Sequence, residues 1–412
     1  MYENFNWKWT NLIFVGRLLT SSVFFMYVGS LPFLFTSWNL TASSAGIIQT
    51  AIVIGFALSL FFSSYLCDYF NPNKILIISA IGNAIASFIF YAYANDFVSG
   101  LFCNLLLGLF QGGIYGPSMI LVSEKYEKIH RGLAMGGVLS GQSFGYALSL
   151  SASFVLSNLY SPSIAFLFCL SCACIGIVPL LLAVLKDLPK KYQFDHSISY
   201  LDTKQSDQNK FLVRGYTAHC VELFGMWAWL PIFLSFILIK DIVISPLVLG
   251  IVIGLILHLS GMFASLMSGV LADKFGRKNI LVIFALSSSV LSFMIGWTTS
   301  WHWTFVCLLS ISYSFFSIGD SGVLTAALSE STQRNVLGRA LAYRSIVGMG
   351  LGSFTPGVFG FILDLTNNYE PVSQNTNWIY AFSFLGLAGL MASYYASKTN
   401  KYASKTNKKV IG

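Results

Sequence analysis

Long apolar segments alternate with short polar connections along almost the whole chain. A helix needs about 20 apolar residues to cross the hydrocarbon core of a bilayer, where its backbone polar groups must be bonded within the protein. Twelve segments meet this requirement, and we expect each to be a transmembrane helix. They cover residues 12–35, 45–67, 75–94, 97–122, 133–156, 164–185, 211–239, 247–270, 280–298, 303–328, 340–363 and 378–395.

The composition agrees with a chain whose solvent is lipid. Of the 412 residues, 55% are hydrophobic and only 10% are charged, whereas soluble proteins carry about 25% charged residues. The first apolar segment is not followed by a small-residue cleavage site, so we expect it to remain as a span. The seven cysteines lie within or beside apolar segments without metal-ligand spacing. We therefore expect no metal and no cofactor.

The sequence indicates two similar halves. The polar segment 186–210 separates six apolar segments from six more, and an interval between a glycine and a proline recurs on either side of it. Gly16 precedes Pro32 by the same interval that separates Gly215 from Pro231. Such repeats are typical of transporters. We predict an N-terminal half at 1–185, a cytoplasmic linker at 186–210, a C-terminal half at 211–396 and a basic cytoplasmic tail at 397–412.

Positive charge is concentrated in every second connection. The opposite set of connections holds only Lys240. Because basic residues are retained on the cytoplasmic side, we expect both termini and the linker to be cytoplasmic, in the plasma membrane. The basic residues of these connections include Lys74, Lys125, Lys128, Arg131, Lys186, Lys190, Lys191, Lys204, Lys210, Lys274, Arg277, Lys278, Arg334 and Arg339.

One connection carries a motif. Residues 269–279 have the sequence GVLADKFGRKN, and residues 64–74 form a degenerate copy in which Asn71 and Pro72 replace the Gly-Arg pair. The loop resembles the signature of the major facilitator superfamily. The resemblance implies an all-α membrane protein with twelve transmembrane helices in two pseudo-symmetric six-helix halves, which transports a solute by alternating access. We expect it to be a monomer.

The residue types of the motif suit a tight turn between two packed helices. Gly269 would allow close helix packing, Asp273 would bond the amides of a helix N-terminus, and Gly276 would permit the turn before Arg277 and Lys278. The resemblance implies that Asp273 braces the opposite half near Gly132, and Asp68 near Gly338. The alternative is that the basic residues only set the topology.

Two arginines lie inside apolar segments. Arg17 is about two turns into the first segment, and Arg344 is about one turn into the eleventh. Charge at membrane depth is costly and indicates a function, although a residue near a helix end can reach the headgroups instead. We predict a cavity role for Arg17, and for Arg344 either a gating role or contact with headgroups. Their shared sign favours an anionic substrate.

Four further ionisable residues are candidates for proton coupling. His219 and Glu222 are three residues apart in the seventh segment, so they neighbour one another on a helix; His258 and Asp320 lie in the eighth and tenth segments. We expect His219, Glu222 and His258 to form a protonation switch, with Asp320 as a further member. The alternative is a set of buried, hydrogen-bonded structural residues.

Polar and aromatic residues suggest a substrate cavity. In the fourth segment Asn104, Gln111 and Tyr115 share one helical stripe, and the resemblance implies that the first, fourth, seventh and tenth helices line the cavity. Tyr27 and Trp227, in the first and seventh segments, are similar candidates. Helix packing or an interfacial aromatic belt would explain the same residues.

These features predict a secondary transporter, not an enzyme. The expected partners are a small-molecule substrate, protons and the lipid bilayer, and no nucleic acid. The leading hypothesis is proton-coupled uptake of a small metabolite, with an anion favoured. The alternatives are a proton-driven exporter of a drug or siderophore-like solute, and a sensor that keeps the fold without transport.

Overall fold

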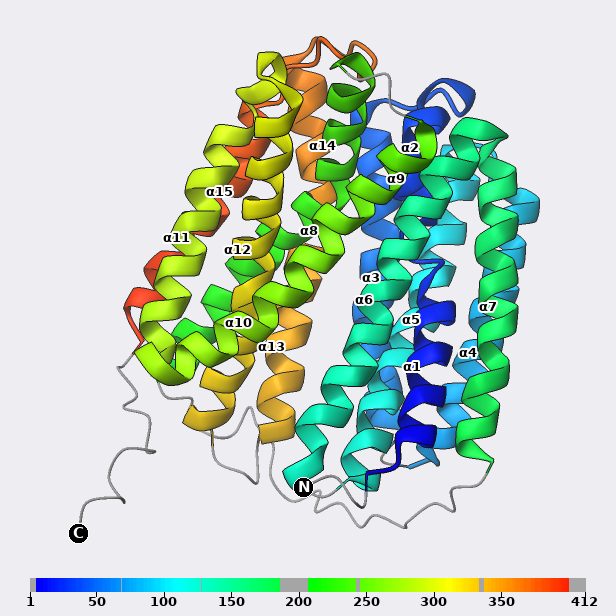
Figure 1. Cartoon of the computed structure of the whole chain (residues 1–412), viewed down its shortest axis with the longest axis vertical. Helices are drawn as coiled ribbons and strands as arrows, with labels where there is room; N and C mark the ends of the chain where they lie inside the picture. Colours follow the sequence, from blue (N-terminus) through cyan, green and yellow to red (C-terminus); the bar gives the residue numbers. More distant parts are fainter. Residues whose placement is uncertain are drawn as a thin grey trace.

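The computed structural model describes residues 5–67, 69–126, 128–185, 207–241, 245–332 and 337–399, and their regular structure is helical (Figure 1). Seven helices precede the linker. They are α1 (Trp7–Ser21), α2 (Met26–Ser37), α3 (Ala42–Leu66), α4 (Pro72–Tyr93), α5 (Phe97–Lys125), α6 (Lys128–Leu159) and α7 (Pro162–Val184).

The helices after the linker include one π-helical and one 3₁₀ segment. They are α8 (Asp207–Asp241), α9 (Pro246–Gly254), the π-helix η2 (Leu255–Leu259), α10 (Ser260–Phe275), α11 (Arg277–Ile295), the 3₁₀ turn η3 (Thr298–Ser300), α12 (Trp303–Ser331), α13 (Leu337–Gly352), α14 (Thr355–Thr366) and α15 (Ile379–Ser397).

The predicted twelve spans are confirmed. In the described part of the chain, eleven helical stretches are long and apolar enough to cross a membrane, and the 32-residue helix α6 makes the twelfth. Serine, glycine and glutamine make α6 more polar than the others. Three spans are interrupted, because α1 with α2, α9 with α10, and α13 with α14 each form one rod with a break in it.

The helices pack as two groups. In the first, α3 packs against α5 and α1 against α6 and α7; in the second, α11 packs against α15 and α10 against α12. Helices α1 and α8 begin, and α15 ends, at one end of the molecule, which we call the basic end because its connections carry the lysines and arginines. The two groups meet where α3 contacts α13 and α14, and where α6 contacts α9 and η2.

A clamp joins the halves at the end opposite the basic end. The buried carboxylate of Asp364 on α14 accepts hydrogen bonds from the backbone N–H groups of Ala42, at 2.9 Å, and Ser43, at 2.8 Å, in the first turn of α3. The Ser43 hydroxyl donates to the same carboxylate. These amides have no partner within their helix and lie at its positive end, so a carboxylate stabilises them.

Glycines bring the two helices of the clamp into backbone contact. A Cβ on Gly46 of α3 would lie 2.1 Å from the carbonyl oxygen of Pro356, and one on Gly360 of α14 would lie 2.1 Å from that of Ala42. No side chain fits at these distances. The clamp therefore holds this end of the molecule closed, and a conformation open at this end must break it.

We predict that Asp364→Asn loosens this clamp. The neutral amide keeps one acceptor but loses the charge that favours the α3 N-terminus, a loss of about 1–2 kcal/mol. Hydrogen exchange of the amides in residues 42–46 should therefore become roughly tenfold faster, measured by mass spectrometry.

Asp96→Asn is the matched control. Asp96 caps α5 at the same end of the molecule, where it accepts from the backbone N–H of Ser99 at 2.7 Å, within its own half. This variant should speed exchange in the first turn of α5 and leave residues 42–46 unchanged. Equal exchange of residues 42–46 in wild type and Asp364→Asn would contradict the assigned role of Asp364.

Candidate functional site

Arg17 is fully buried in the N-terminal half. Its Nη2 donates to the side-chain oxygen of Gln142 on α6, and the Gln142 amide donates to the hydroxyl of Tyr146 one turn further along. The ring of Tyr115 on α5 lies 5.3 Å from the guanidinium carbon. Among the described residues, Nε and Nη1 of Arg17 have no hydrogen-bond partner.

Arg344 on α13 has a similar environment in the C-terminal half. Its side chain is buried, its Nη1 donates to the hydroxyl of Thr325 on α12 at 2.9 Å, and its guanidinium carbon lies 4.1 Å from the ring centre of Tyr216 on α8. The Nε of Arg344 has no partner within the described part of the chain. Protein therefore covers the Arg344 side chain in this conformation, which favours a role within the protein over contact with headgroups.

The two arginines face one central region. The phenol of Tyr115, from the N-terminal half, is close enough to both Arg17 and Arg344 to interact electrostatically with each. A buried guanidinium with unbonded N–H groups pays a large desolvation cost, which an anion accepting from those groups would offset. Arginine also offers carboxylates a paired donor geometry. The arginine pair, Arg17 and Arg344, can therefore hold an anion between the halves.

A polar network leads from Arg344 to His219. Thr325, which accepts from Arg344, donates to the carbonyl oxygen of Ser321 at 2.9 Å, and the Ser321 hydroxyl lies 2.7 Å from Nε2 of His219. The other ring nitrogen, Nδ1, lies 2.8 Å from a carboxylate oxygen of Asp320. Both His219 and Asp320 are buried. The His219–Asp320 pair is therefore linked to Arg344 through Thr325 and the backbone and hydroxyl of Ser321.

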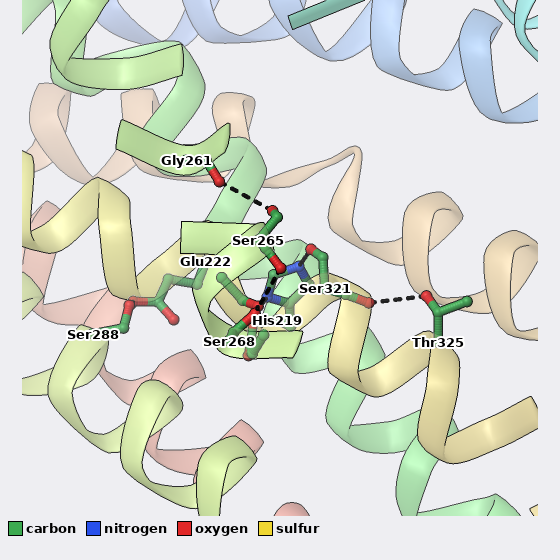
Figure 2. Close-up of polar contacts among 10 residues, drawn as sticks. His219, Glu222, Gly261, Ser265, Ser268, Ser288, Ser321 and Thr325 are labelled. Carbon is green, nitrogen blue, oxygen red and sulfur yellow. Dashed lines mark hydrogen bonds and ion pairs between the residues drawn. The ribbon is translucent and has the colours of Figure 1, made fainter. Parts of the chain in front are cut away.

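Glu222 does not belong to this network. Although it is three residues from His219 on α8, its carboxylate accepts from the hydroxyl of Ser288 on α11 and lies close to Gly389 on α15. Figure 2 shows its side chain directed toward Ser288, while His219 meets Ser321 on the other side. The sequence-based grouping of His219 with Glu222 is therefore replaced by a pair of His219 with Asp320.

His258 lies in a third place, within an aromatic cluster formed by both halves. Its ring centre is 4.9 Å from that of Phe25, 5.7 Å from that of Tyr146 and 6.1 Å from that of Trp227. The Nε2 of His258 and the Nε1 of Trp227 have no partner among the described residues. The cluster adjoins Arg17 through Tyr146 and Gln142, so Trp227 and His258 lie near Arg17 and not in the His219–Asp320 pair.

Helix breaks surround this region. The first span is interrupted at residues 22–25, and His258 lies in the π-helical segment η2. The break frees the carbonyl of Thr20, which accepts from the amides of Asn83, at 3.1 Å, and Gln111, at 2.6 Å. Broken helices within a membrane are tolerated where neighbours satisfy the freed groups, and they are typical of binding sites.

Three predicted cavity residues have packing contacts instead. Gln111 supports the break in the first span, Asn104 donates to the carbonyl of Ile48 on α3 at 3.2 Å, and the hydroxyl of Tyr27 donates to the carbonyl of Ala45 at 3.2 Å. All three are buried. Of the predicted cavity set, Arg17 and Tyr115 contact one another, and Trp227 lies beside Tyr146.

The motif loop forms an ion-pair network within its own half. Arg277 donates to Glu330 on α12 at 2.7 Å and 2.9 Å and lies 3.1 Å from Asp273. Gly276 has a φ of 89°, which glycine adopts without strain. The expected close packing at Gly269 is wrong for this conformation, because a Cβ there would meet no atom within 4 Å.

The bracing role of the loop stays a prediction. Asp273 is 72% exposed and its described ion pair is with Arg277, while the side chains around Gly132 and Gly338 lie outside the described residues, as does Asp68. Lys278 lies in the first turn of α11. The resemblance implies that this brace forms when the basic end is closed.

Several residues of the site were missed in the sequence. Gln142 and Tyr146 lie in a segment rich in glycine, and their spacing of four places them on one helical face, which is the signal that could have found them. Thr325 and Ser321 carried no signal at all, since serine and threonine are common in membrane helices. Asp364 could have been found as an acidic residue near the end of an apolar segment.

Comparison with known proteins gives consistent matches along the chain. The family described as Major Facilitator Superfamily matches residues 13–214 and, a second time, residues 215–410. The chain is 22% identical over 355 residues to a probable 4-methylmuconolactone transporter of Cupriavidus pinatubonensis, covering 82% of this chain and 79% of that one. It is 24% identical over 368 residues to the hexuronate transporter of Bacillus subtilis, covering 82% and 83%.

A solved structure shows the same fold. The crystal structure of a D-xylose-proton symporter superposes with a TM-score of 0.75 at 16% sequence identity, and the match covers 96% of this chain and 98% of that one. At this identity the likeness concerns the fold alone.

We predict that Gln111→Leu destabilises the protein without weakening ligand binding. Losing the amide leaves the freed Thr20 carbonyl with one donor fewer, which costs about 1 kcal/mol within a membrane. The unfolding midpoint in detergent should fall, while the concentration of a stabilising ligand that gives half-maximal effect stays constant. If the unfolding midpoint stays the same and a higher ligand concentration is needed for the half-maximal effect, Gln111 contacts the substrate instead.

Proposed function

The chain belongs to the major facilitator superfamily and is a multi-pass membrane transporter, and from this premise we propose that it carries a small organic anion by proton-coupled alternating access. The observation that carries the proposal is the buried arginine pair, with unbonded N–H groups on both Arg17 and Arg344. Neither arginine has a carboxylate partner among the described ion pairs. A carboxylate substrate would supply the missing negative charge.

The relatives support an anionic substrate. A hexuronate is a sugar carboxylate, and the Bacillus subtilis protein is named as its transporter. The carboxylate is the simplest group that could bond Arg17 from one half and Arg344 from the other. Because the two arginines come from different halves, binding an anion between them would draw the halves together, as alternating access requires.

Proton coupling is assigned to the His219–Asp320 pair. Its members are 2.8 Å apart, buried, and linked to Arg344 through Ser321 and Thr325. Gain of a proton changes the charge of the pair by one unit, so it changes the electrostatic balance around Arg344 in a region of low dielectric. Substrate binding and proton binding would then favour one another, which is the requirement for symport.

The charge asymmetry supports an orientation for the carrier, and the proposed coupling to protons supports a direction. The basic end would face the cytoplasm by the positive-inside rule, so the Asp364 clamp would close the outer side. A carrier that loads protons and an anion outside, where the pH is lower, would release both inside. We therefore favour uptake over export.

We predict that carboxylates stabilise the protein through Arg17. A thermal unfolding screen should compare matched pairs: galacturonate with galactose, and nicotinate with nicotinamide. The charged member of at least one pair should raise the unfolding midpoint, and Arg17→Gln should abolish that rise, because the neutral amide cannot pair with the anion.

Two controls interpret this result. Arg17→Lys keeps the charge but loses the paired donor geometry, so it should bind the same carboxylate more weakly without losing it. Counterflow of that carboxylate in vesicles separates a carrier from a sensor, since a sensor binds without exchange. An anionic substrate would be contradicted if the charged and neutral members of each pair raised the unfolding midpoint equally. It would also be contradicted if the carboxylate stabilised Arg17→Gln as much as the wild type.

We predict that Asp320→Asn uncouples transport from protons. Vesicles containing this variant should fail to accumulate the substrate under an imposed pH gradient, while exchange of substrate at equal pH continues, because exchange needs no net change in protonation. Glu222→Gln is the matched control, because Glu222 is a buried acid of the same half that accepts from Ser288 instead. If Asp320→Asn still accumulates the substrate fully, Asp320 is not the coupling residue. If accumulation is lost only in Glu222→Gln, Glu222 is the coupling residue.

A further inference from the structure

A groove runs along the outside of the C-terminal half. It is bounded by α8, α13 and α15 and has a volume of about 700 Å³. Its walls are largely apolar, and Leu351, Leu387 and Met391 expose more than half of their side-chain surface there. Residues so apolar and so exposed face lipid in a membrane protein. The groove is thus separate from the arginine pair, whose side chains are buried.

The groove has the length of one leaflet. On α8 it extends from Lys210 to Val221, and a helix rises 1.5 Å per residue, so these eleven steps span about 16 Å. The hydrocarbon core of a bilayer is about 30 Å thick, which makes each leaflet about 15 Å. The groove therefore extends from the basic end of the molecule to the region of the bilayer midplane.

Charge is confined to one end of the groove. Lys210 and Arg214 lie where α8 begins, and the remaining lining residues are uncharged. Lys210 lies 3.0 Å from Asp207, but Arg214 is exposed and has no ion-pair partner within the described residues. A single-leaflet apolar channel with a cationic mouth matches a lipid that has an acyl chain and a negative headgroup.

We propose that this groove is a binding site for one anionic phospholipid of the leaflet at the basic end. An acyl chain lies along α8 between α13 and α15, and the phosphate and its negative headgroup pair with Arg214 and Lys210. The site is independent of the proposed transport function, because it involves neither arginine of the pair nor the His219–Asp320 network. Since α13 also carries Arg344, a lipid here would fix the position of a helix that borders the substrate region.

The test uses the full-length protein in detergent, titrated with dioleoyl phosphatidylglycerol or with dioleoyl phosphatidylcholine, which share their chains and differ in net charge. Phosphatidylglycerol should raise the unfolding midpoint at lower concentration. Each basic residue near a membrane surface contributes about a fivefold change in binding. Arg214→Gln should therefore raise the half-saturating concentration about fivefold, and the double variant with Lys210→Gln more.

Two further variants separate specific from general effects. Lys74→Gln removes an exposed lysine at the basic end of α4, outside the groove, and should leave the titration unchanged. Ala388→Phe fills the groove without altering charge and should weaken binding of both lipids.

Three results would overturn the proposal. Equal titrations for the two lipids would remove the headgroup preference, and an effect of Lys74→Gln as large as that of Arg214→Gln would indicate non-specific surface attraction. If Ala388→Phe abolished transport while lipid binding stayed the same, the groove would be an entry path for substrate instead.

Discussion

Every polar group that the bilayer surrounds must be bonded within the protein, and the arrangement of the central region follows from this constraint. The first span is broken at residues 22–25, and the carbonyl that the break frees is bonded by amides from α4 and α5. The break in turn places Phe25 against His258 and Tyr146. Polar residues that look like substrate contacts in the sequence are here the supports that permit an irregular backbone next to the site.

Both arginines are among the buried residues whose polar atoms are not all bonded within the described part of the chain. Nε and Nη1 of Arg17 and Nε of Arg344 have no hydrogen-bond partner among the described residues although both side chains are buried, which is costly unless a ligand supplies the acceptors. Their neighbours share a pattern, because each guanidinium faces a tyrosine ring and donates to one polar side chain. The two halves thus present similar chemistry to a common region, as their repeated sequence suggests.

A carboxylate at a helix N-terminus joins the halves at one end of the molecule, and the motif loop predicts a similar contact at the other end. At the end opposite the basic end, Asp364 bonds the N-terminus of α3 across the interface between the halves. The motif loop carries Asp273 at the basic end, where it is exposed and pairs with Arg277 in its own half. The contact between a carboxylate and a helix N-terminus is favourable but involves few groups. Such a contact can form and break as the halves move.

The sequence by itself determined the twelve spans, the division into two halves and the family resemblance, because hydropathy over about 20 residues reports on the lipid surroundings without knowledge of any neighbour. It also indicated Arg17, His219 and Asp320 as candidate functional residues, because an ionisable side chain within an apolar segment is unusual. Tertiary structure alone decided the partners. His219 and Glu222 are neighbours on α8, but the packing of α11 and α12 on different sides directs one toward Asp320 and the other toward Ser288. Helical spacing says which side chains share a face, whereas the identity of the helix that each side chain meets depends on contacts far apart in the chain.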